Sequence, residues 1–177
     1  MNVDKISKIM PKKTKKHTKR VVQLCKKFTK KLSLKKDRRK KLIEAAQLHD
    51  IAKKKKEDDR HHKKNAVLLT LEDIEYEYDC DFDVDDDVLN IIECHRKRFK
   101  PKEKNQMEAA ILRICDTLDK YKKMEEEIED IEEKCNKVLE YVNDNFDEGI
   151  SEKFNKIYNE LKDKGKNKLL ERLNDMN

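Results

Sequence analysis

Histidine and aspartate residues lie on the few apolar faces of an otherwise very polar chain. One apolar run ends at the adjacent pair His49 and Asp50, and His95 closes another apolar stripe. His17 shares the face of a third stripe, and Asp116 lies inside the most apolar stretch of the chain. Imidazole and carboxylate groups bind divalent transition metals, and a buried carboxylate needs a cation or a donor. The pattern therefore predicts that these side chains converge on one metal site.

The elements that must position these residues are helices. Only 36% of the residues are hydrophobic and 46% are charged, with two Gly and two Pro in 177 residues. So few turn formers beside so many Lys and Glu argue against a sheet. The apolar residues recur at a helical period, which argues for a folded domain rather than disorder. We expect an all-α protein with a heavily charged exterior.

Five stripes predict five successive helices, and each carries at least one candidate ligand. They run through Val21–Phe28, Leu42–Leu48, Ala66–Ile74, Val88–Ile92 and Ala109–Leu118, and the third is expected to begin near His61 or His62.

After Met124 the pattern of residues changes. An amphipathic apolar stripe runs from Ile128 to Val142, with acidic residues on the other faces. A turn is expected near 143–149, then a helix with Ser151 as its N-cap, then a last short helix after Gly165. We assign residues 1–123 to the main domain and 124–177 to a C-terminal helical extension that packs on the domain or on a partner. The extension would also suit a homodimer interface, and packing within the chain is at least as good an explanation.

The net charge of +6 is unevenly distributed. Roughly the first third carries about 25 Lys and Arg against about seven acids. Such a surface is either a solvated face or an attractive field for a polyanion such as a nucleotide, polyphosphate or nucleic acid. Aromatic residues make up only 6% of the chain and none is interleaved with the basic run, so nucleic acid is weakly supported.

The five cysteines are odd in number, widely spaced and free of any CxxC pair. They are expected to be reduced packing thiols. No apolar run is long enough to span a membrane, and the N-terminus lacks an apolar signal core. These features predict a cytoplasmic protein without a membrane partner.

The order of the candidate ligands resembles that of the HD-domain superfamily of metal-dependent phosphohydrolases, an all-helical fold. The stretches HTKRVVQLC (17–25), AAQLHDIAK (45–53) and AAILRICDTLD (109–119) look like the family's first, HD and closing Asp helices. Within the superfamily, HHKKNAVLL (61–69) and IIECHRKRFKP (91–101) look closest to the C-terminal domain of the exopolyphosphatase/guanosine pentaphosphatase family. Enzymes of that family carry an actin-like domain in front of this region. We expect no such domain here, so any chemistry would come from the HD site itself.

The resemblance implies a role for each candidate residue. His17, His49, Asp50 and Asp116 would hold one divalent ion, with His61 (favoured over His62) and His95 adding a second. The mixed nitrogen and oxygen set suits Mn, Fe, Co, Ni or Zn. Asp50 and Lys53 would be catalytic, and the residues that would bind substrate phosphates are Lys53, Arg96 and Arg98.

The implied function is a metal-dependent phosphohydrolase acting on a nucleotide or another small polyanionic phosphoester or phosphoanhydride. The alternative is a non-catalytic module that keeps the HD scaffold to bind polyphosphate, an alarmone or nucleic acid.

Overall fold

Every regular element in the described part of the chain is helical, as the composition predicted. The computed structural model describes residues 10–54, 64–78, 82–95, 105–121 and 128–174. Its helices are α2 (Lys12–Lys31), α3 (Lys36–Leu48), the short 3-10 helix η1 (Ile51–Lys54), α4 (Lys64–Tyr78), α5 (Asp86–Cys94), α6 (Gln106–Lys120), α7 (Ile128–Asn145) and α8 (Glu148–Asn174).

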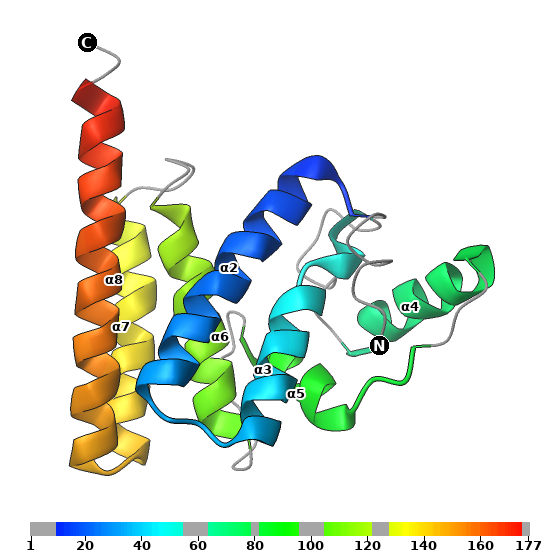
Figure 1. Ribbon diagram of the computed structural model, residues 1–177, viewed down its shortest axis with the longest axis horizontal. Helices are drawn as coiled ribbons and strands as arrows, with labels where there is room; N and C mark the ends of the chain where they lie inside the picture. Colours follow the sequence, from blue (N-terminus) through cyan, green and yellow to red (C-terminus); the bar gives the residue numbers. More distant parts are fainter. Residues whose placement is uncertain (1–9, 55–63, 79–81, 96–104, 122–127, 175–177) are drawn as a thin grey trace.

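The central helix is α6, which packs against α2, α3 and α5 on one side and against α7 and α8 on the other. Figure 1 shows α2 crossing in front of α6 with α3 beside it, and α7 and α8 together at one end of the molecule. Its Ile111, Leu112 and Ile114 are fully buried. Because α6 is enclosed on several sides, most of its residues are buried, and its buried acids need partners.

Two helix ends place histidines in the interior. Helix α3 ends at Leu48 and α5 ends at Cys94, so His49 and His95 each occupy the C-cap position. At the other end of α5, the Asp85 carboxylate accepts the Asp87 amide N–H at 2.7 Å, and Asp86 and Asp87 lie in the first turn. Acids in the first turn of a helix suit its dipole.

The C-terminal helices cover the domain. The predicted stripe of α7 is buried through Ile131, Cys135, Val138 and Val142. From α8, Phe154 packs against Phe28 of α2, with ring centroids 5.0 Å apart and both side chains fully buried. This part of the extension therefore packs within the chain.

Two expectations about the tail are wrong. Helix α8 begins at Glu148 rather than after Ser151, whose hydroxyl instead donates to the Val142 carbonyl of α7 at 3.0 Å. The helix also continues through Gly165, which is buried against the Tyr121 ring. A single Gly in a helix costs only about 1 kcal/mol relative to Ala, so packing on α6 outweighs it.

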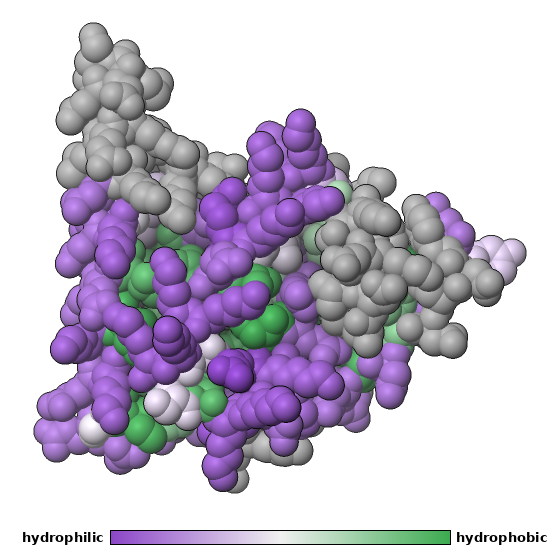
Figure 2. Space-filling model, in the orientation of Figure 1, coloured by the Kyte–Doolittle hydropathy of each residue, from purple (hydrophilic) through white to green (hydrophobic). Residues whose placement is uncertain are grey.

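Cys25, Cys94, Cys115 and Cys135 are buried and form no disulfide, while Cys80 lies outside the described residues. Among the described helices, none is both long and apolar enough to cross a membrane. Hydrophilic side chains cover most of the face shown in Figure 2.

Candidate metal centre

Three side chains from three helices meet in the interior between α2, α3 and α6. His17 comes from α2, His49 from the C-cap of α3 and Asp116 from α6. All three are buried, and each offers one ligand atom within 4.8 Å of the others. The two histidines are 32 residues apart in the sequence, and His49 and Asp116 are 67 residues apart. Only the packing of the helices brings them together.

The nitrogens that face each other are the Nε2 atoms. His17 Nε2 lies 3.2 Å from His49 Nε2 and 3.0 Å from Asp116 Oδ1, and His49 Nε2 lies 3.8 Å from the same oxygen. Two imidazole nitrogens bound to one tetrahedral ion at about 2.0–2.1 Å would stand about 3.3 Å apart. The pair of histidines is thus spaced as ligands of a shared ion are.

Hydrogen bonds at the opposite ring nitrogens set the tautomer. His49 donates Nδ1–H to the Ala46 carbonyl at 2.8 Å, and His95 donates Nδ1–H to the Ile92 carbonyl. Each acceptor lies three residues earlier in the last helical turn, where carbonyls lack an intrahelical partner. A C-cap position therefore both buries the imidazole and leaves the lone pair on Nε2, the form that binds a metal.

Asp50 joins the cluster from the residue after His49. Its Oδ2 lies 3.6 Å from His17 Nε2 and 3.8 Å from His49 Nε2, and the carboxylate is buried. Lys53, on η1, places its Nζ 3.3 Å from the same oxygen, with half of its side chain exposed. The structure thus brings together His17, His49, Asp50 and Asp116, with Lys53 at the edge.

Two further charged residues complete the site, and the sequence reasoning missed both as site residues. Asp119 is fully buried on α6 and accepts Nδ1–H of His17 at 2.8 Å. Its two oxygens also accept Nε–H and Nη2–H of Arg20 at 2.7 and 2.8 Å. Arg20 follows His17 by three residues and Asp119 follows Asp116 by three, so each shares a helix face with a predicted ligand. That three-residue spacing is the feature of the sequence that could have identified them.

The electrostatics of the cluster favour a bound cation. Burial by itself lowers the pKa of His17, but hydrogen bonds to Asp116 and Asp119 outweigh it and raise the pKa to about 9. Burial by itself raises the pKa of Asp116, but the His17 hydrogen bond and the nearby histidines hold the pKa well below its usual range. Buried carboxylates that stay ionised need a compensating positive charge. A proton on His17 supplies it in the metal-free protein.

The remaining predicted residues separate into two groups. His95 is buried beside His49, with ring centroids 5.4 Å apart, but it is not one of the three residues whose ligand atoms lie within 4.8 Å. His61, His62, Arg96 and Arg98 lie outside the described residues.

Comparison with known proteins identifies the family. Neither the curated proteins nor the solved structures gave a match to this chain. The family described as "HD domain" matches residues 14–124, which is more than half of the chain and includes His17, His49, Asp50 and Asp116. The chain belongs to the HD-domain family, whose members bind divalent metals and are generally phosphohydrolases.

Proposed function

We propose that this protein is a metal-dependent phosphohydrolase that acts on a nucleotide or another small polyanionic phosphoester or phosphoanhydride. The observation that carries the proposal is the buried meeting of His17, His49 and Asp116, with both imidazole Nε2 atoms turned toward one point. Two neutral histidines whose Nε2 lone pairs face each other across 3.2 Å repel unless a proton or a shared cation lies between them. A shared divalent ion is the explanation that we propose.

The protein residues have separable tasks in this proposal. A divalent ion, when bound, acts as a Lewis acid and makes water a nucleophile near neutral pH. His17, His49 and Asp116 would hold and orient it, and Asp50 would add a fourth ligand atom, an oxygen, on the side of η1. Lys53 places an ammonium beside Asp50 with part of its side chain in solvent, where it can reach a substrate phosphate.

The substrate class rests on charge. The net charge of +6 and the basic first third of the chain favour an anionic substrate. The motifs HHKKNAVLL and IIECHRKRFKP support a link to the exopolyphosphatase/guanosine pentaphosphatase family within the HD superfamily, and we propose phosphoanhydrides as the first compounds to test.

The metal content of the purified protein tests the site. Elemental analysis after incubation with Mn, Fe, Co, Ni or Zn should find at least one equivalent of one metal in the wild type and a loss of it in His49→Ala and in Asp116→Ala. Glu108→Ala is the control, because Glu108 is also a buried carboxylate of α6 but pairs with Arg38 away from the cluster. Circular dichroism should show helical spectra for all four proteins.

Turnover is then tested with the preferred metal on phosphoesters and phosphoanhydrides. Hydrolysis that is lost in Asp116→Ala and retained in Glu108→Ala supports the proposal. A wild-type protein that stays metal-free, or that binds metal without turnover of any compound, contradicts it and favours the non-catalytic binding module.

A further inference from the structure

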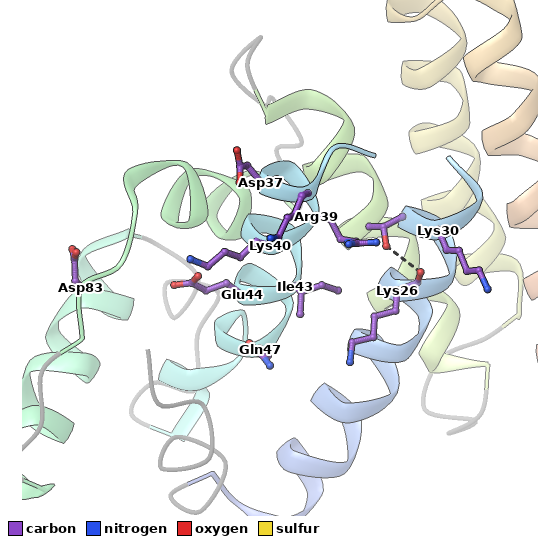
Figure 3. A pocket seen from close by; sticks show the side chains of 11 residues that line it. Lys26, Lys30, Asp37, Arg39, Lys40, Ile43, Glu44, Gln47 and Asp83 are labelled. Atoms are coloured by element: carbon purple, nitrogen blue, oxygen red, sulfur yellow. Dashed lines mark hydrogen bonds between the residues drawn. The ribbon is translucent and has the colours of Figure 1, made fainter. Parts of the chain in front are cut away.

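A groove between α2 and α3 lies apart from the metal centre. It has a volume of about 1010 Å³, and no residue of the metal cluster lines it. Its walls carry five cations from two helices: Lys26, Lys30, Lys36, Arg39 and Lys40. Figure 3 shows Lys26 and Lys30 on α2 and Arg39 and Lys40 on the neighbouring α3. Side chains from different parts of the sequence therefore concentrate positive charge in one concavity.

These cations differ from their neighbours along the same helices. Lys31 pairs with Glu160, Arg38 with Glu108, and Lys41 with Asp85 and Asp87. Within the part of the chain that the structure describes, none of the five groove cations lies within 4.0 Å of a carboxylate oxygen. The fold thus uses some basic residues of α2 and α3 to join helices, while the five that line the groove form no such pair with a described residue.

The acids of the groove do not cancel this charge. Three carboxylates line it, from Asp37, Glu44 and Asp83, against five cations. Figure 3 shows Glu44 and Asp83 on the side of α3 that faces away from α2. Lys40 lies on the same side of α3 as Glu44, so the labelled cations nearest the space between the two helices are Lys26 and Arg39.

The lining also limits what can bind. It contains one large apolar side chain, Ile43, and no aromatic residue. Bases of single-stranded nucleic acid are held mainly by stacking on aromatic rings, which this surface lacks. The volume corresponds to the upper end of small-ligand sites, roughly 300–1,000 Å³. Charge rather than stacking must hold the ligand.

We propose that this groove is a second anion site, which binds a small ligand with several adjacent phosphate groups through Lys26, Arg39 and the neighbouring lysines. The shared chemistry is that of inorganic triphosphate and of the phosphate chain of a nucleoside triphosphate. The site is independent of turnover, because it lies on the outer side of α2 and α3 and contains none of the metal-cluster residues.

Titration calorimetry with tripolyphosphate in EDTA tests the groove while no metal ion is bound at the metal centre. The variant Lys26→Gln/Arg39→Gln removes one cation from each wall. The matched control Lys27→Gln/Lys153→Gln removes the same charge from exposed residues outside the groove. We expect the dissociation constant to rise about tenfold or more in the groove variant, since each lost contact is a charge-assisted hydrogen bond, and to change little in the control.

Further ligands distinguish the sources of the phosphate chain. ATP should bind about as well as tripolyphosphate, and adenosine should not bind. Equal weakening in the groove variant and the control, or no binding by the wild type, overturns the proposal. Stronger, groove-dependent binding of duplex DNA than of tripolyphosphate also overturns it, in favour of a nucleic-acid surface.

Discussion

Asp119 accepts a hydrogen bond from His17 Nδ1 at 2.8 Å, while Arg20 donates hydrogen bonds to both oxygens of the same carboxylate. This arrangement fixes the imidazole with its Nε2 toward His49 and Asp116. Carboxylates that hold a metal-binding histidine through its other nitrogen set both its orientation and its basicity. Asp119 is therefore a positioning residue, although no ligand atom of its own faces the cluster.

Replacing Asp119 with Asn should weaken metal binding by about 10–100-fold without removing a ligand, which is the usual effect of losing such a partner. The amide can present its NH₂ group to the imidazole and invert the tautomer. Competition with a fluorescent chelator measures the affinity. Glu108→Gln is the matched control, because it also breaks a buried carboxylate–arginine pair on α6. Equal losses of affinity in both variants would mean that the effect is general destabilisation.

Metal affinity should increase with pH up to about pH 9. The pKa of His17 is raised from 6.5 to about 9 in the metal-free protein, so below that pH a metal must displace a proton from Nε2. Chelator competition at pH 6, 7 and 8 measures the dependence. In Asp119→Asn, which loses one of the hydrogen bonds that raise this pKa, the dependence should shift to lower pH. An affinity independent of pH over this range would show that His17 is not a ligand.

The free energy of unfolding of the metal-free protein should decrease as the pH rises, whereas its metal affinity increases. A histidine whose folded pKa exceeds its unfolded value of 6.5 stabilises the fold fully below pH 6.5, and this contribution is lost as pH rises through about 9. Urea unfolding in EDTA should therefore give a lower midpoint at pH 9 than at pH 6.5. Excess metal should reverse the trend, since binding to the folded state stabilises it.

The buried cluster of His17, His49 and Asp116 was predictable from sequence because each of these residues lies on an apolar stripe. A helical period fixes which residues share a face, so His17, His49 and Asp116 could be assigned to the interior before any contact was known. The roles of Arg20 and Asp119 beside His17 were not predicted. Both are charged residues, and their pairing depends on how α2 packs on α6. A three-residue spacing suggests a common face but does not reveal what lies opposite.

The tail shows where local signals fail. Ser151 is a residue type that often caps a helix N-terminus and Gly165 is one that often ends a helix, yet both lie inside α8. Burial of Phe154, Ile157 and Tyr158 against the domain stabilises one continuous helix by more than either residue costs. Such tertiary effects depend on contacts between residues far apart in the sequence, as between Phe154 and Phe28.

The metal content of the His95→Gln variant should show whether the site of the wild-type protein holds one ion or two. The His95 ring packs edge-on against His49, and its Nδ1–H is held by the Ile92 carbonyl, so its Nε2 carries the lone pair. We expect the wild type to bind two equivalents of Mn at saturation and His95→Gln to bind one, because His17, His49 and Asp116 remain. Equal metal content in the two proteins would assign His95 to the core.

Phe154→Ala should destabilise the protein by about 3–5 kcal/mol, the usual cost of truncating a fully buried aromatic side chain. Phe154 packs on Phe28, which lies on the helix that carries His17, so the loss also loosens one wall of the metal centre. Ile150→Ala is the control in the same helix, since Ile150 is exposed and should cost less than about 1 kcal/mol. Urea unfolding of both variants measures the difference. Stabilities that match would mean that α8 does not support the domain in solution, and metal titration of Phe154→Ala then shows whether residues 14–124 keep the site alone.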